Sequence, residues 1–261
     1  MERQRKRRLT QQETHELLLE EGVRALHGQG VGVGLDAVNL EGAIRSTGVA
    51  RASAYRLWPA TDDHGPQDLF QREVLQRAIG ARDAAITRTI EVVTEIIGRL
   101  GERATPHELY RAMIRPGAQT NLEGIRASPE WRIVIALHSL MSARPEHARD
   151  PDLVAMLDAA EAEWRARIEN DFYRPLQDLL GLTPRPAFGD DAIQLMIVAA
   201  NALAEGLISK DALRGPSSYV DRTWTLDDGQ EWSLFALVFE AIVPIFFETP
   251  WDDEALGPSS G

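Results

Sequence analysis

Apolar residues recur at helical spacing through almost the whole of this 261-residue chain. A helix that packs on one face repeats its apolar side chains at every third or fourth position, whereas a half-buried strand alternates them. Only residues 223–226 have the composition of a short strand, and they suit an ordered loop equally well. Because one strand makes no sheet, the sequence predicts an all-α fold. We expect helices at residues 11–27, 40–46, 50–58, 67–100, 105–115, 128–143, 150–174, 190–209 and 231–247.

Three signals near the N-terminus predict where the first helices begin and end. Thr10 is followed three residues later by Glu13, which is the spacing of a capping box. Asn39 is a favoured N-cap residue for the second helix, and Gly48 interrupts that helix. We therefore expect a small head at residues 1–66, a larger helical body at 67–250, and a flexible tail at 251–261.

Charge and cysteine content limit the function classes. The chain has 28 Lys and Arg against 40 Asp and Glu, a net charge of −12, which argues against a protein that coats nucleic acid. It has no cysteine, which excludes disulfides, cysteine-bound zinc, iron–sulfur clusters and thiol catalysis. The charge is uneven, because residues 1–60 hold nine basic and seven acidic residues, a net of +2, and the remainder carries −14. No acid lies between Glu41 and Asp62, in the stretch that holds Arg45, Arg51 and Arg56.

The sequence predicts a cytoplasmic protein with no membrane partner. The basic N-terminal residues are not followed by the apolar region of a secretory signal. The longest apolar run, residues 234–247, is interrupted by Glu240 and Pro244. It is shorter than the roughly 20 residues that a helix needs to span a bilayer.

Residues 40–58 have the pattern of a helix-turn-helix. Two short predicted helices flank Gly48, and the second presents arginines and hydroxyls outward. Arginine can form two hydrogen bonds with guanine, and hydroxyls suit phosphate oxygens. An ordinary helical hairpin with an arginine-bearing solvated face fits the same pattern. The apolar positions expected to form the core of the pair are Leu40, Ala43, Ile44, Val49, Ala54 and Leu57.

This stretch resembles the DNA-binding head of the TetR (tetracycline-repressor-like) family of transcriptional regulators. Gly48-Val49-Ala50 resembles that family's turn, Ser53-Ala54-Tyr55 its recognition helix, and Trp58 its closing aromatic residue. The resemblance covers about residues 8–75, and residues 202–207 resemble the family's penultimate helix. It implies a three-helix head and a helical ligand-binding and dimerisation body. It also implies a ligand-responsive homodimer, expected to be a repressor, on a near-palindromic DNA operator.

The resemblance further implies which residues contact DNA. Tyr55, Ser53 and Arg56 would contact phosphate, while Arg51 and Ala52 would face base edges. An N-terminal arm would follow the minor groove or the backbone; a disordered solvated tail is the alternative. The DNA-binding residues that are implied are Arg45, Thr47, Arg51, Ala52, Ser53, Tyr55 and Arg56, with Arg7 and Arg8 in the arm.

Three departures from the family pattern bear on DNA binding. Ala50 stands where that family usually has a serine cap, a loss of about 1 kcal/mol, for which Thr47 could partly substitute. The loop at residues 59–67 is acidic and lacks the customary lysine. The glycine-rich stretch at 28–34 lengthens the connection between the first two helices. The alternative function is therefore an all-α scaffold or small-molecule-binding protein with a degenerate helix-turn-helix that does not bind DNA.

The last two predicted helices favour a homodimer. Apolar residues surround the helix at 190–209 on most sides and almost fill the helix at 231–247. A helix that is apolar all round must be buried on all sides, and docking against a second copy would achieve this. A central core helix within the monomer is the alternative.

Bulky residues of the body are candidates for a ligand cavity, although most such stripes form plain core. In the family that the chain resembles, that cavity holds a small organic effector, commonly apolar or aromatic. The ligand-binding candidates are Trp131, His138, Met141, Trp164, Phe172, Tyr173 and Met196.

Other patterns are weak, so we expect neither an enzyme nor a cofactor or metal. The glycine run at 28–34 is not followed by Gly-Lys-Ser/Thr. Asp62-Asp63-His64 fits a polar loop better than a metal site. The six histidines form no metal-binding pair at helical spacing, and no Gly-x-Ser-x-Gly motif occurs.

Overall fold

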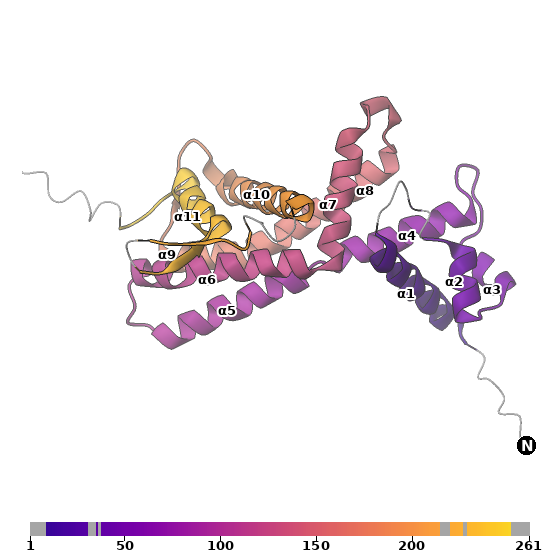
Figure 1. The fold of residues 1–261 in the computed structure, drawn as a ribbon, viewed down its shortest axis with the longest axis horizontal. Helices are drawn as coiled ribbons and strands as arrows, with labels where there is room; N and C mark the ends of the chain where they lie inside the picture. Colours follow the sequence, from indigo (N-terminus) through magenta and orange to yellow (C-terminus); the bar gives the residue numbers. More distant parts are fainter. Residues whose placement is uncertain (1–8, 31–34, 36–37, 215–219, 227–228, 252–261) are drawn as a thin grey trace, which may run out of the picture. The chain divides into compact units, whose positions relative to one another are not determined.

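The computed structural model describes residues 9–30, 35, 38–214, 220–226 and 229–251, and these are mostly helical (Figure 1). The predicted all-α fold class is confirmed. The chain forms two compact units, which we call the head unit (Met1–Arg82 with Pro129–Ala160) and the body unit (Asp83–Ser128 with Glu161–Gly261). The boundary predicted at residue 66 stays a prediction. The predicted tail lies outside the described residues, apart from Trp251.

The first helices of the head unit begin where the sequence predicts. The Thr10 hydroxyl accepts a hydrogen bond from the Glu13 amide at 3.1 Å, and the Glu13 carboxylate accepts one from the Thr10 amide at 2.7 Å. The Asn39 side chain accepts one from the Gly42 amide at 3.0 Å. The capping box and the second cap are therefore confirmed. The helices of this unit are α1 (Gln11–Gln29), α2 (Leu40–Thr47), α3 (Arg51–Tyr55), α4 (Pro66–Gly80), α7 (Pro129–Ala143), η1 (Glu146–Ala148) and the first part of α8 (Pro151–Ile168).

The body unit contains longer helices and two very short sheets. Strand β1 (Thr183–Pro184) pairs antiparallel with β4 (Phe247–Glu248), and β2 (Thr223–Thr225) pairs antiparallel with β3 (Glu231–Ser233). Helices α5 and α6 pack along each other, and α11 packs against both α6 and α10. The helices are α5 (Ala84–Leu100), α6 (Pro106–Ala127), the end of α8, η2 (Glu169–Tyr173), α9 (Arg174–Leu180), η3 (Gly189–Asp191), α10 (Ala192–Arg214) and α11 (Leu234–Phe246).

Several predicted helix boundaries are wrong. The helix expected at 67–100 is interrupted after Gly80, where the buried Arg82 donates to the Ala160 carbonyl at 2.9 Å. The helix expected to end near residue 115 runs through Pro116 to Ala127, because burial of its second half offsets the hydrogen bond that proline lacks. The helix expected at 50–58 is only Arg51–Tyr55, and that expected at 231–247 starts after β3.

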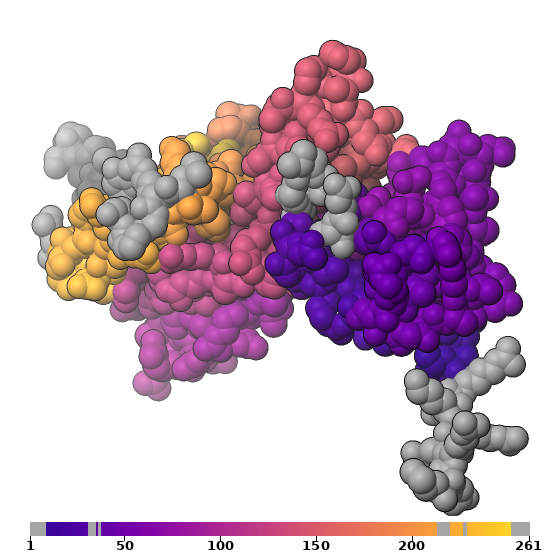
Figure 2. All heavy atoms as spheres, turned by 45° about the vertical axis from the view of Figure 1, so that its right-hand side comes forward, coloured from indigo at the N-terminus to yellow at the C-terminus, as the bar shows by residue number. Residues whose placement is uncertain are grey.

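Trp58, just after α3, packs against neighbouring helices. Its indole nitrogen donates to Glu73 Oε2 at 2.6 Å, its ring stacks on His15 at 5.2 Å, and it meets Phe70 edge-on at 4.9 Å. Helices α1 and α4 cross closely at Gly22, where an added Cβ would lie 2.5 Å from Val74. Figure 2 shows α1 to α4, in indigo and violet, as one packed mass. Packing and the hydrogen bond of Trp58 therefore together position α3 against α1 and α4.

One stretch within the described residues, Gly189–Ala212, is long and apolar enough to cross a membrane by length and composition alone. It was not expected from the sequence, where the longest apolar run lies at 234–247. Of its most apolar window, 33% is buried within the protein. Core helices of soluble proteins pass the same test, so the stretch is weak support for a membrane span. The cytoplasmic location stays a prediction.

Candidate functional site

The outer side of α2 and α3 is the first candidate site. The core predicted between these two helices is largely confirmed. Its members Leu40, Ala43, Ile44 and Ala54 are buried, and Val49 and Leu57 are half-buried. Gly48, with φ of +69°, makes the left-handed turn between the two helices. The predicted DNA-binding residues of α2 and α3 come together here: Arg45, Arg51, Ala52 and Arg56 are exposed, and Thr47, Ser53 and Tyr55 are half-buried. Arg7 and Arg8 lie outside the described residues.

Two of these residues share a carboxylate that sequence reasoning did not connect with them. The Tyr55 hydroxyl donates to Glu41 Oε1 at 2.6 Å, and Arg51 Nη2 lies 2.8 Å from the same oxygen. The Arg51 guanidinium also lies over the Tyr55 ring, 5.3 Å from its centre. Hydrogen bonding to Tyr55 and the charge of Glu41 raise the pKa of Arg51 above its ordinary value. Arg51 and Tyr55 lie in a stretch of sequence without acids, but in the folded protein both contact the carboxylate of Glu41.

The remaining contacts of α3 are weaker. Arg56 Nη2 donates to the Ser53 hydroxyl at 3.1 Å. The first turn of α3 begins at Ala50 and has no side-chain cap. The expectation that Thr47 supplies part of this cap is wrong, because the Thr47 hydroxyl donates to the Ala43 carbonyl of its own helix at 2.7 Å.

Two glutamines of α4 position the site, and sequence reasoning missed them. Gln67 Oε1 accepts from the Leu40 amide at 2.9 Å, which satisfies an amide at the start of α2. Gln67 Nε2 donates to the Val38 carbonyl at 2.6 Å, and Gln71 Nε2 donates to the same oxygen at 3.0 Å. Their spacing of four residues on α4 is the only sequence signal, and it is too common to identify such a role.

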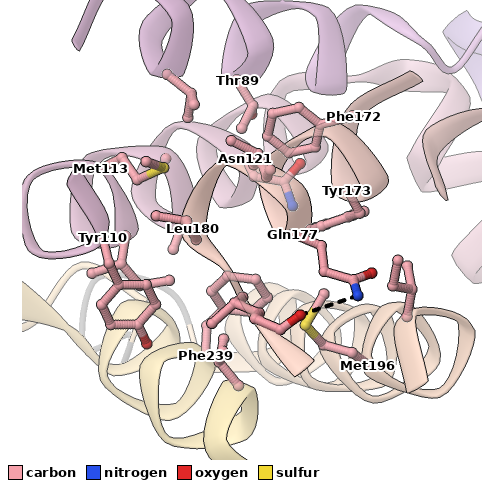
Figure 3. A pocket seen from close by; sticks show the side chains of 18 of the residues that line it. Thr89, Tyr110, Met113, Asn121, Phe172, Tyr173, Gln177, Leu180, Met196 and Phe239 are labelled. Carbon is pink, nitrogen blue, oxygen red and sulfur yellow. Dashed lines mark hydrogen bonds between the residues drawn. The ribbon is translucent and has the colours of Figure 1, made fainter. Parts of the chain in front are cut away.

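The second candidate site is an apolar cavity within the body unit (Figure 3). Its free volume is about 80 Å³, which is small against the roughly 300–1,000 Å³ of most small-molecule sites. The lining residues that the structure describes carry no charge. They are Thr89, Val93, Tyr110, Met113, Ile114, Gly117, Ala118, Asn121, Phe172, Tyr173, Leu176, Gln177, Leu180, Leu182, Ile193, Met196, Phe235, Phe239, Val243 and Phe247.

A π-helical turn brings adjacent aromatic residues to the cavity. Pro175 has no amide hydrogen, and its ring would clash with the carbonyl four residues earlier in a regular α-helix. The helix instead widens into η2, where the Arg174 amide donates to the Glu169 carbonyl. As a result Phe172 and Tyr173, which are adjacent in the chain, both line the cavity. Burial raises the pKa of the Tyr173 hydroxyl to about 12.

Few polar groups face this cavity, and most already have partners. The Thr89 hydroxyl donates to the Ala85 carbonyl at 3.2 Å, and Gln177 Nε2 donates to the Leu182 carbonyl at 3.2 Å. The Tyr110 hydroxyl lies 3.4 Å from the carbonyl of Glu240, which is the group that Pro244 leaves without its helical donor. Among the described lining residues, the Asn121 amide and the Tyr173 hydroxyl have no hydrogen-bond partner in the protein. They are therefore the groups available to orient a ligand.

The cavity contains three of the seven predicted ligand-binding residues, namely Phe172, Tyr173 and Met196. Trp164 belongs to the same unit but is not part of the lining. Trp131, His138 and Met141 lie on α7 in the head unit, where Trp131 is buried against the Arg82 guanidinium. Helical spacing placed all seven side chains inward, but it did not reveal that they belong to two separate cores. Among the described residues, no group of three or more His, Asp or Glu side chains is placed to hold a metal ion.

Comparisons with known proteins assign no family to the chain. No family model matches the chain. No solved structure matches it. The chain is 26% identical over 179 residues to a Corynebacterium jeikeium (strain K411) protein described as an AAA ATPase forming ring-shaped complexes. The alignment covers 62% of this chain and 30% of that protein, so the chain spans less than a third of the relative's length.

Proposed function

We propose that this chain is a homodimeric transcriptional regulator that binds a near-palindromic DNA operator and responds to a small organic effector. The observation that carries the proposal is the geometry of residues 40–58. Two short helices close on a buried core around a left-handed glycine turn, and arginines and hydroxyls gather on their outer side. A helix-turn-helix of this kind places its second helix in the major groove.

The charges of the head suit this role. Arg51, at the start of α3, has the guanidinium that recognises guanine, and the Ser53 and Tyr55 hydroxyls suit backbone phosphates. The body carries most of the net negative charge, which would oppose unspecific adhesion to DNA. Binding would therefore depend on two heads that act together at half-sites about 34 Å apart, or a multiple of that distance.

A dimer is supported by matching apolar stripes on α10 and α11, which pack against each other. Leu195 and Val198 are 41% and 48% exposed, and Ala202 continues their stripe along α10. Val238, Ala241 and Ile245 have the same spacing on α11, and Ile245 is 54% exposed. Exposed apolar stripes on adjacent helices are typical of an interface. A second copy would cover them with the same residues around a two-fold axis.

The lining of the cavity supports an effector that is small, uncharged and largely apolar. Its described lining has no charged side chain to neutralise an ionised ligand. The Asn121 amide and the Tyr173 hydroxyl would orient a carbonyl or hydroxyl group of such a molecule. Binding would change DNA affinity only to the extent that the effector prefers one of two protein states. A protein with this role acts where the DNA is, which fits the cytoplasmic location expected from the sequence.

The experiment that tests this function is selection of DNA from a random-sequence pool by the full chain. We expect enrichment of a two-fold related motif that the Arg51→Ala variant does not enrich. A matched control is Arg99→Ala, which changes an exposed arginine of α5 in the body unit. No enrichment by the wild type, or equal enrichment by the Arg51→Ala variant, would contradict the proposal.

The competing function is a helical scaffold or small-molecule-binding protein whose helix-turn-helix does not bind DNA. The uncapped first turn of α3 and the acidic, exposed Asp62 and Asp63 favour it. Absence of DNA binding at low ionic strength would select it. We propose no ATPase activity by analogy with the relative, because no Gly-Lys-Ser/Thr phosphate-binding motif occurs in this chain.

A further inference from the structure

Glu41 of α2 contacts two side chains on the outer side of α3, Tyr55 and Arg51. Glu41 Oε1 accepts a hydrogen bond from the Tyr55 hydroxyl at 2.6 Å, and the same oxygen lies 2.8 Å from Arg51 Nη2. Arg51 and Tyr55 also contact each other, with Nη2 3.5 Å from the hydroxyl. All three side chains belong to the surface proposed to meet DNA.

A carboxylate held in this way has the chemistry of a backbone phosphate. Both are anionic oxygen acceptors, and arginine and hydroxyl donors bind either one by charge-assisted hydrogen bonds. Glu41 lies in the first turn of α2, where the partial positive charge of the helix end favours an anion. Its position is therefore set by α2 and does not depend on the presence of DNA.

We propose that Glu41 is an internal competitor of DNA phosphate that sets the affinity of the head for DNA. The inference rests on the proposed DNA-binding function. Tyr55 and Arg51 must leave Glu41 before they can bind DNA, and the carboxylate then faces a polyanion. This penalty applies at every sequence, so it weakens unspecific and operator binding by the same factor, and a site that also offers base contacts to Arg51 is the one that stays bound. Glu41 thereby lowers unspecific binding in addition to the net charge of the chain.

An ordinary stabilising ion pair would behave differently. The Arg51 side chain is 70% exposed and that of Glu41 is 35% exposed, and pairs this exposed contribute little to folding. Removal of Glu41 should therefore leave the thermal unfolding of the head almost unchanged and alter its DNA affinity. The opposite pattern, lost stability without altered affinity, is what a purely structural role predicts.

The test measures binding of full-length wild-type, Glu41→Ala and Glu20→Ala proteins to a random-sequence duplex of about 30 base pairs, which is long enough for two half-sites. Glu20 is an exposed acid of α1, so its variant removes the same charge elsewhere in the head. We expect Glu41→Ala to bind roughly fivefold more tightly than the wild type, the upper range for release of an exposed pair. Glu20→Ala should change binding less than twofold.

A second readout is the salt dependence. In the wild type, the Glu41 carboxylate that binding exposes attracts cations, which offsets part of the counterion release from DNA. The slope of log affinity against log salt should therefore be steeper for Glu41→Ala than for the wild type. In an Arg51→Ala/Tyr55→Phe background, the Glu41→Ala change should lose most of its effect.

Failure of this inference and failure of the proposed function have different signatures. A wild type that binds DNA with an affinity and salt slope equal to those of Glu41→Ala refutes the role of Glu41 alone. A Glu20→Ala effect as large as that of Glu41→Ala does the same, because it reduces the result to net charge. If neither the wild type nor Glu41→Ala binds DNA at low salt, the DNA-binding function itself is refuted and this inference with it.

Discussion

The crossing of α1 and α4 at Gly22 makes the sharpest stability prediction. A Cβ at this position would lie 2.5 Å from Val74 Cγ2 and 2.9 Å from Phe70 Cζ, whereas carbon atoms in contact prefer about 3.5–4.0 Å. Val74 and Phe70 are both 0% exposed, so neither has free space into which to move. Gly22→Ala therefore forces α1 and α4 apart by roughly 1 Å.

The expected magnitude is a balance of two effects. Overpacking of a buried contact costs about 1–3 kcal/mol, and replacement of a helical glycine by alanine returns roughly 0.5–1 kcal/mol. We therefore expect Gly22→Ala to lower the free energy of unfolding by about 1 kcal/mol, and by about 2.5 kcal/mol at most. Gly28→Ala is the matched control, because Gly28 lies on the same helix with nothing within 4 Å of an added Cβ. That variant should be as stable as the wild type or slightly more stable.

Urea denaturation followed by circular dichroism measures both variants. A Val74→Ala change in the Gly22→Ala background should recover part of the loss, because it removes the methyl group that the new Cβ meets. A Gly22→Ala protein as stable as Gly28→Ala would refute the close helix crossing, and with it the placement of α3 by α1 and α4.

Three further outcomes follow from the structure. Ala50→Ser should add the missing cap of α3, stabilise the head by about 1 kcal/mol and tighten DNA binding; unchanged thermal unfolding would contradict it. Tyr173 keeps its proton in the folded state up to a pKa of about 12 against an ordinary value of 10.0. Its contribution to the free energy of unfolding is therefore complete below pH 10 and is lost as pH rises towards 12. The free energy of unfolding of Tyr173→Phe should accordingly depend less on pH in that window, as measured by urea denaturation. Val198→Glu should convert a particle of twice the 29.0 kDa chain mass into a monomer in light scattering, whereas Ala212→Glu should not.

The local signals of the sequence predicted the head well because they act over a few residues. Thr10 and Glu13 form their capping box, Asn39 caps α2, and Gly48 turns the chain, each within one helical turn. Fold class followed from apolar periodicity for the same reason. The π-turn before Pro175 and the passage of α6 through Pro116 were missed, because packing of the whole helix decides whether a proline ends it.

The sites were predictable only in part because they depend on tertiary contacts. The seven bulky residues assigned to one cavity divide between two units, since periodicity shows that a side chain points inward but not into which core. The stretch without acids between Glu41 and Asp62 suggested a purely cationic surface. In the fold, Glu41 contacts Arg51, which lies 10 residues later in the chain, and Tyr55, which lies 14 residues later. No local sequence pattern indicates these contacts.

The measurement that tests the central claim most directly is equilibrium binding of the full chain to the duplex it selects, compared with an Arg51→Ala/Tyr55→Phe variant of equal thermal stability. Loss of a base contact and a phosphate contact should weaken binding by at least about tenfold, since each is expected to contribute about 1 kcal/mol or more. An affinity equal to that of the wild type would show that α3 is not the surface that meets DNA.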